Sequence, residues 1–139
     1  MPAVAPASEA WSLLIELLQS QRQRWLEAAS DVGLRPGQAH LLRLLDDADP
    51  VPMRRLACAM RCDPSNITGL ADRLEERGLV ERRAEPGDRR VKALALTAEG
   101  TRVRDELAER LKDPPEEIAS LSAADQRALR DALRKALGR

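Results

Sequence analysis

Aromatic side chains are almost absent from this chain, and their absence limits what its core can be. The 139 residues include two tryptophans, Trp11 and Trp25, and no phenylalanine or tyrosine. The core must therefore be built from Leu, Ala, Val and Ile, which favours helices with small residues at their contacts. The length suits one domain, but such a core is thin. We therefore expect a partner subunit to cover further apolar surface.

Apolar residues recur at helical spacing along most of the chain. The pattern predicts a first helix that is capped by Ser8 and runs through Trp25 towards Ala29. The other predicted helices are Gly37–Asp47, about Met53–Met60, Pro64 to about Arg77, one that follows Thr97 and one that follows Ser122.

Several residues mark where these helices begin and end. Asp63 is a suitable N-cap for the helix that starts at Pro64, and Gly78 is suited to its C-terminal end. Thr97 and Ser122 are predicted to cap the two helices that follow them. By contrast, Pro52 leaves the short helix from Met53 without an obvious polar cap.

Between Leu79 and Thr97 the apolar pattern changes from the helical period to alternation, which indicates a two-stranded hairpin. Its turn is the sequence Glu85-Pro86-Gly87-Asp88. In the second strand, Val91, Ala93 and Ala95 are expected on one face and Lys92, Leu94 and Leu96 on the other.

The short helix, the tight turn and the longer helix form a candidate helix-turn-helix. On the longer helix, a stripe of Ile67, Leu70, Ala71 and Leu74 is predicted to be buried. Its exposed N-terminal half offers small polar groups and a glycine, which suit contacts with base edges and phosphates: Ser65, Asn66, Thr68 and Gly69. The alternative is an ordinary solvated helix face.

The hairpin that follows is rich in positive charge, although the chain as a whole has zero net charge. The segment from Arg77 to Lys92 holds six basic and three acidic residues. A basic hairpin directly after a helix-turn-helix is typical of a winged helix, in which arginines at the tip reach an adjacent minor groove. The predicted fold class is therefore mainly α with a small β-hairpin.

The segment from Asp72 to Gly100 resembles the MarR family of bacterial regulators. The family pattern in the wing is matched without gaps by Asp88, Arg90, Leu96, Thr97 and Gly100. The resemblance covers nearly the whole chain, from Ser8 onward. Arg35 departs from it, because the family often has a helix-capping threonine at this position.

The resemblance implies a homodimer that represses transcription from a pseudo-palindromic operator in double-stranded DNA. Ser65, Asn66, Thr68 and Arg73 would lie on the recognition helix. Arg90 would enter the minor groove with Asp88 orienting it, and Arg89 would contact a phosphate. Two-fold symmetry would place the recognition helices about 34–36 Å apart.

The family also implies a division of the chain and a ligand. We expect a flexible lead-in over 1–7, dimerisation helices over 8–30 and 98–139, and a DNA-binding lobe over 36–97 with its wing at 79–97. Small aromatic or phenolic effectors bind between these parts in many members. Trp11, Trp25, His40 and Arg43 are the candidates to line such a cleft, unless the tryptophans belong to the dimer core.

Other chemistries are not indicated by the sequence. No phosphate-binding glycine loop, nucleophile with a base, or metal cluster is present, so we expect neither an enzyme nor a cofactor. Cys58 and Cys62 are expected to be small buried side chains rather than redox sensors. No apolar run reaches the roughly 18 residues of a membrane span, and two cysteines without a disulfide framework favour the cytoplasm.

Two rival functions remain open at this stage. One is a winged helix that binds a protein partner, with a wing that is merely charged. The other is a ligand-binding protein that does not bind DNA.

Overall fold

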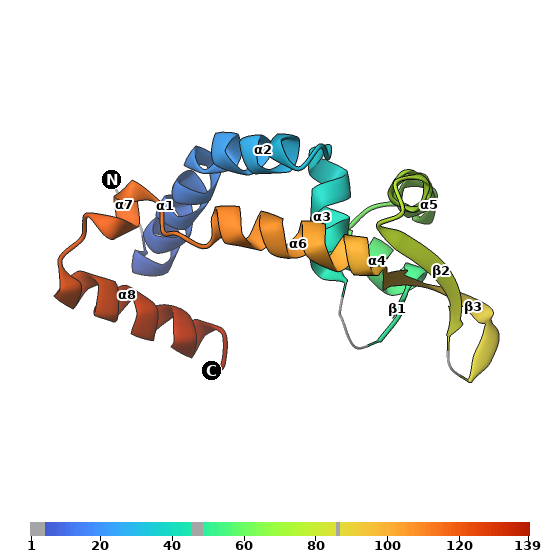
Figure 1. Ribbon diagram of the computed structural model, residues 1–139. Helices are drawn as coiled ribbons and strands as arrows, with labels where there is room; N and C mark the ends of the chain where they lie inside the picture. The colour runs from blue at the N-terminus through green and yellow to red at the C-terminus, as the bar shows by residue number, and fades with distance from the viewer. Residues whose placement is uncertain (1–4, 46–48, 86) are drawn as a thin grey trace.

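A winged helix-turn-helix lies at one end of the molecule and two terminal helical segments lie at the other (Figure 1). The computed structural model describes residues 5–45, 49–85 and 87–139. Its elements are α1 (Pro6–Ser20), α2 (Arg22–Asp31), α3 (Pro36–Leu44), β1 (Val51–Pro52), α4 (Met53–Met60), α5 (Pro64–Glu76), β2 (Val80–Glu85), β3 (Asp88–Leu96), α6 (Ala98–Leu111), α7 (Glu116–Ala119) and α8 (Ala123–Ala136). The predicted fold class is confirmed.

The N-terminal segment differs from the single helix that was predicted. α1 begins at Pro6 with Ala5 as its N-cap, so Ser8 does not cap it and residues 6 and 7 are not part of a lead-in. The helix ends at Ser20, whose hydroxyl donates a hydrogen bond to the carbonyl of Leu17 at 2.6 Å. This competes with the helical bonding pattern, and the chain resumes as α2 at an angle to α1 (Figure 1). Residues 1–4 lie outside the described residues.

The helix that was predicted over Gly37–Asp47 begins one residue earlier and is described to Leu44. Pro36 occupies its first turn, where a proline costs no hydrogen bond. The backbone N–H of Arg35 donates to Oε1 of Gln38 at 3.2 Å. The start of α3 is therefore held without the threonine that the family often uses. Asp46 and Asp47 lie outside the described residues.

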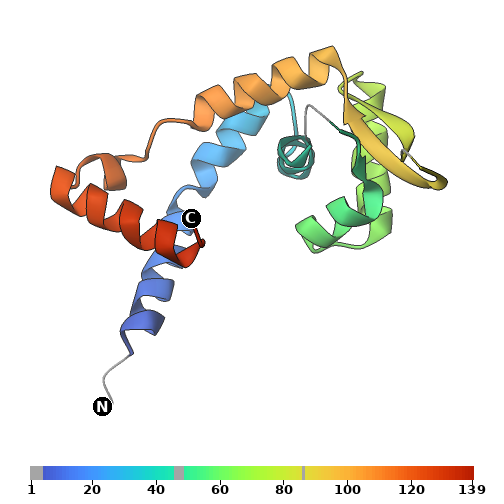
Figure 2. The ribbon, with the colours of Figure 1, turned by 90° about the horizontal axis from the view of Figure 1, so that it is seen from below.

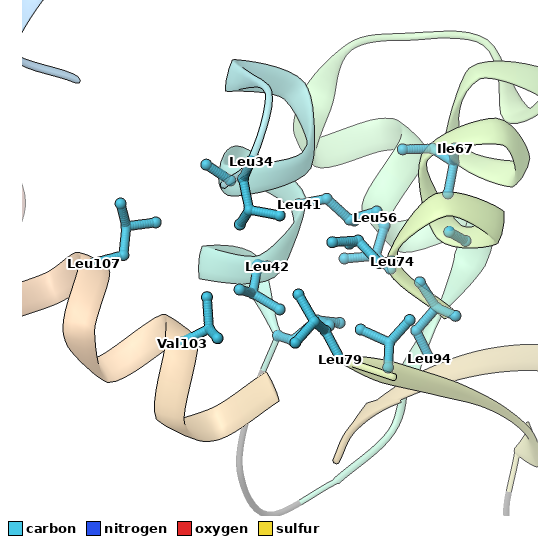
Figure 3. Close-up of a cluster of buried hydrophobic side chains, with 14 of the residues drawn as sticks. Leu34, Leu41, Leu42, Leu56, Ile67, Leu74, Leu79, Leu94, Val103 and Leu107 are labelled. Atoms are coloured by element: carbon cyan, nitrogen blue, oxygen red, sulfur yellow. The ribbon is translucent and has the colours of Figure 1, made fainter. Parts of the chain in front are cut away.

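The hydrophobic core lies inside the winged-helix lobe, between α3, α4, α5, the sheet and α6 (Figure 3). As predicted, Ile67, Ala71 and Leu74 of α5 are buried, while Leu70 is half-buried. Val103 and Leu107 carry α6 into the same core. Its largest fully buried side chains are all aliphatic, as the composition requires: Leu41, Leu42, Leu56, Ile67, Leu74, Leu79, Leu94, Leu107 and Val80.

The wing is the outer part of a three-stranded antiparallel sheet with the strand order β1-β3-β2. The hairpin pairs Val80 with Leu96 and Arg83 with Ala93. The third strand, β1, was not predicted; it pairs Val51 with Leu94. Consequently β3 is the central strand, and its inner residues 93–95 are all buried instead of alternating with exposed ones. Pro86 of the turn lies outside the described residues.

The ends of α4 and α5 lie close to the positions that the sequence predicts. Pro64 occupies the first turn of α5, and Gly78 adopts a φ of 71° after its end. Asp63 is the N-cap residue of α5, as predicted, but its side chain makes no capping hydrogen bond. Pro52 precedes α4 without a side-chain cap, as expected.

The C-terminal helix α8 packs little against the rest of the described chain. Ser122 caps it by accepting a hydrogen bond from the N–H of Asp125 at 3.1 Å, as predicted. None of its 14 residues is buried. Both ribbon views place it at the end of α6 away from the wing (Figures 1 and 2). No helix among the described residues is long and apolar enough to cross a bilayer.

Candidate nucleic-acid interface

The N-terminal half of α5 presents a small polar surface to solvent. Ser65, Asn66, Thr68, Gly69 and Arg73 are all exposed, so the structure places these candidates together on one helix. A Cβ atom added at Gly69 would meet no other atom within 4 Å, which shows how open this face is. The Thr68 hydroxyl donates to the carbonyl of Pro64 at 3.1 Å. Its lone pairs therefore remain available to a donor on a ligand.

A groove of about 470 Å³ lies beside this face. One side is formed by Ser65, Asn66 and Arg73 of α5, and the other by Arg35 and Gln38 at the start of α3. Two guanidinium groups thus border a surface of small polar residues. Positive side chains at the border of a groove favour the binding of an anion there.

The wing tip carries the arginines that the sequence singled out. Arg89 and Arg90 are exposed on β3, at the far end of the hairpin from the core. Asp88 accepts a hydrogen bond from the backbone N–H of Arg90 at 3.0 Å through Oδ1. Asp88 therefore fixes the backbone from which the Arg90 side chain extends. Its contact is with the main chain of Arg90 rather than with the guanidinium.

Arg82 joins the wing to the recognition helix, a contact that the sequence pattern did not predict. Its Nη1 lies 2.8 Å from Oε1 of Glu75, and its Nη2 pairs with Asp72. Its backbone N–H also donates to Oε2 of Glu75 at 3.2 Å. The hydrogen bond with Asp72, opposed by partial burial and aided by the charge of Glu75, raises the pKa of the Arg82 guanidinium. The pairing neutralises two carboxylates that would otherwise stand next to the polar face of α5.

Thr97 joins Gly78, which follows the recognition helix α5, to the start of α6. Its hydroxyl donates to the carbonyl of Gly78 at 2.6 Å and accepts from the N–H of Gly100 at 3.0 Å, which confirms the predicted cap. Gly100 is buried, and a Cβ there would lie 1.8 Å from the carbonyl oxygen of Leu79. The close approach explains why this position requires glycine.

The structure brings together three of the four candidate effector residues. Trp25, His40 and Arg43 line a pocket of about 480 Å³ between α2, α3 and α6, with Arg22 and Leu107 among its other walls. Trp11 does not line it; this side chain is 62% exposed on α1. The break after Ser20 separates the helix that carries Trp11 from the one that carries Trp25.

The two cysteines are not both buried, contrary to expectation. Cys58 is exposed on α4, and Cys62 is half-buried beside the groove of α5. Both are free thiols. Within the described ranges, no group of three or more His, Cys, Asp or Glu side chains is placed to hold a metal ion.

Comparison with known proteins agrees with this architecture. Residues 34–92 match the MarR family. The repressor MdtR of Bacillus subtilis is 36% identical over 84 residues, or 60% of this chain, which spans about half (54%) of that relative. The repressor NicR of Pseudomonas putida is 31% identical over 88% of this chain and 78% of its own length. A solved structure of CouR from Rhodococcus jostii, bound to p-coumaroyl-CoA, superposes with a TM-score of 0.71 at 32% identity, covering 95% of this chain and 94% of CouR.

Proposed function

This chain belongs to the MarR family of transcriptional regulators, and from that premise we propose that it binds double-stranded DNA sequence-specifically as a homodimer. The observation that carries the proposal is the exposed polar face of α5 beside a basic wing. These are the two parts that a winged helix uses to read adjacent grooves of DNA.

Each candidate residue takes a role that suits its chemistry. Ser65, Asn66 and Thr68 supply hydrogen-bonding groups to base edges in the major groove. Gly69 lets the helix approach closely, and Arg73 at the edge of the same face contacts a phosphate. On the wing, Arg90 enters the minor groove, with Asp88 holding its backbone, and Arg89 contacts a phosphate.

The exposed apolar residues of the terminal helices support the dimer. Trp11 is 62% exposed, Leu13 58%, Leu133 39% and Leu137 67%. Side chains of this kind are covered in a stable homodimer, and α1 with α8 offers the surface. We assign residues 8–30 and 98–139 to dimerisation and 36–97 to the DNA-binding lobe. Two-fold symmetry then sets the recognition helices about one DNA turn apart, facing a pseudo-palindrome.

We further propose that the pocket beside Trp25 receives a small aromatic or phenolic effector that releases the DNA. Trp25 offers an aromatic face, and Arg43 with His40 offers hydrogen-bond donors. The pocket contacts both α2 and α3, so a ligand there can change how the DNA-binding lobe sits on the dimer helices. CouR, a structural relative, binds p-coumaroyl-CoA.

The remaining parts of the proposal follow from this activity. The protein acts by binding rather than by catalysis, and it works in the cytoplasm, where bacterial operators lie. Repression is the outcome we propose, since MdtR and NicR are both named as repressors.

The decisive experiment is to sequence the genomic DNA fragments that the purified protein retains and to measure their affinity against salt. A DNA reader enriches a pseudo-palindrome and weakens steeply as salt rises. Retention of no sequence, with affinity that is flat in salt, would reject DNA reading. It would favour a protein-binding winged helix or a ligand-binding protein without DNA activity.

A further inference from the structure

The turn between α4 and α5 contains an arginine in a backbone conformation that favours glycine. Arg61 has a φ of 50° and a ψ of 47°, and it is the one residue other than glycine with a positive φ in the described ranges. The turn is well formed: the N–H of Arg61 donates to the carbonyl of Cys58, and that of Cys62 to the carbonyl of Ala57, both at 3.1 Å. Such a helix end requires the left-handed conformation, whatever its side chain.

An arginine at this position carries a conformational cost that a glycine would not. Its Cβ crowds the backbone in the left-handed region, whereas glycine has no Cβ to crowd. No hydrogen bond or ion pair with another described residue offsets this cost. The Arg61 side chain is exposed, and among the described residues it makes no hydrogen bond or ion pair. The part of the fold that the structure describes therefore gives no reason for a charged side chain at this position.

The position of Arg61 points to a ligand outside the chain. It ends α4 in the turn that leads to α5, and its neighbours Met60 and Cys62 line the groove that Ser65 and Asn66 also line. Arg35 and Arg73 border the same groove. The first turn of a recognition helix is the part that enters a major groove. In the helix-turn-helix arrangement the preceding helix crosses the DNA backbone, and Arg61 is the residue that ends this helix.

We propose that Arg61 contacts a DNA phosphate at the edge of the major groove that receives α5. This assignment rests on the proposed function, because it requires that the chain binds DNA through α5. The contact is with the backbone and carries no sequence information. It adds affinity on every DNA sequence and steepens the salt dependence by about 0.9 for each protomer.

The test is Arg61→Gly, in which binding and stability are expected to change in opposite directions. Glycine relieves the left-handed backbone, so the melting temperature rises by a few degrees. Loss of one phosphate contact makes the slope of log affinity against log salt shallower by about 0.9 per protomer, which at 0.1 M salt corresponds to roughly eightfold weaker binding per protomer.

The probe is a fluorescent duplex of random sequence, about 30 base pairs long so that it spans two half-sites, titrated between about 50 and 200 mM KCl. Arg61→Lys keeps the charge and should retain the wild-type slope. Arg127→Gln on α8 removes one positive charge away from the DNA-binding lobe and should leave the slope unchanged.

The outcomes separate this inference from the function on which it rests. If the wild-type protein shows no salt-dependent affinity for the duplex, the proposed function fails. If the wild-type protein binds but Arg61→Gly binds with the same affinity and slope, Arg61 is not a phosphate contact. A fall in melting temperature would also overturn the inference, since Arg61 would then be retained for the fold.

Discussion

The absence of a side chain at Gly100 allows the start of α6 to pack closely against the backbone of Leu79. Its α-carbon lies so close to the backbone of Leu79 that a Cβ would stand 1.8 Å from the carbonyl oxygen. The same carbonyl accepts a hydrogen bond from the N–H of Thr97 at 3.1 Å. It cannot shift without breaking that bond, so the start of the wing and the start of α6 are joined at Gly100.

We predict that Gly100→Ala destabilises the protein by about 3 kcal/mol, because the Leu79 carbonyl must move and lose its bond. Urea or thermal unfolding measures the effect. Gly69→Ala is the matched control, since it also lies in a helix but its Cβ would meet no atom within 4 Å. This control should be more stable than wild type by up to about 1 kcal/mol. Equal effects of the two substitutions would contradict the argument.

Arg90 and Arg89 are adjacent on the wing but are expected to behave differently. We predict that Arg90→Ala weakens operator binding by about 1–3 kcal/mol and relaxes preference among operator variants, as for an arginine in a groove. Arg89→Ala should weaken operator and random DNA alike, as for a phosphate contact. Fluorescence anisotropy on both kinds of DNA tests this pair. Wild-type affinity in Arg90→Ala would exclude it from the interface.

At the scale of elements, the wing is attached to the recognition helix through Arg82. The guanidinium on β2 reaches Asp72 and Glu75 on α5, and it also donates to the carbonyl of Thr68 at 3.4 Å. The pairs are partly exposed, so they add little to the free energy of unfolding. Their effect falls instead on binding, because unpaired carboxylates on α5 would repel DNA phosphates and the wing would lose its fixed orientation.

We therefore predict that Arg82→Gln changes stability by less than about 1 kcal/mol but weakens DNA binding by about threefold to tenfold at low salt. Adding Asp72→Asn and Glu75→Gln to this variant should restore part of the affinity. Arg102→Gln is the control, since Arg102 also pairs with two carboxylates, Glu99 and Glu106, but on α6. An equal loss of affinity in the control would show that the loss does not depend on the position of Arg82 beside α5.

Features that depend on residues close in the sequence could be predicted. Features that depend on how helices and strands pack against one another could not. The caps at Thr97 and Ser122 each involve a residue three positions later, so the local pattern was enough. The strand β1 has two residues and contains a proline, and its pairing with β3 depends on how the lobe closes. The partners of Arg82 depend in the same way on how the hairpin docks against α5.

In the candidate interface, too, local features could be predicted and features that depend on packing could not. The polar face of α5 follows from helical spacing, so its members were identified together. Trp11 was a candidate to line the effector pocket, with the dimer core as the alternative, and it lies on a different helix from Trp25. The break after Ser20 turns α1 away from α2, and nothing in the apolar pattern marks that break. Arg61 was missed because its significance lies in a backbone conformation rather than in its residue type.

At the scale of the whole molecule, the terminal helices expose apolar residues that the proposed dimer would cover. The apolar stripe of α8 includes Leu129 and Leu133 and continues to Leu137 at the C-cap, and none of these residues is buried. We predict that Leu133→Glu shifts the dimer to monomer and so weakens operator binding, because one protomer contacts a single half-site. Sedimentation velocity at micromolar concentration measures the shift.

Lys135→Gln is the control for Leu133→Glu. It changes the charge by the same amount on the opposite side of α8, as judged by helical spacing. This variant should remain dimeric and bind as wild type does. A monomeric wild-type protein at micromolar concentration would contradict the dimer itself.

The exposure of α8 makes the order of this helix depend on the concentration of the protein. A helix of 14 residues in which none is fully buried is marginally stable alone, so in the proposed dimer its order depends on association. Association obeys mass action, and the folded fraction of this helix then rises with the number of chains present. If less protein is synthesised, fewer chains are present, and a smaller fraction of those chains has an ordered α8. Both changes would lower the occupancy of the operator.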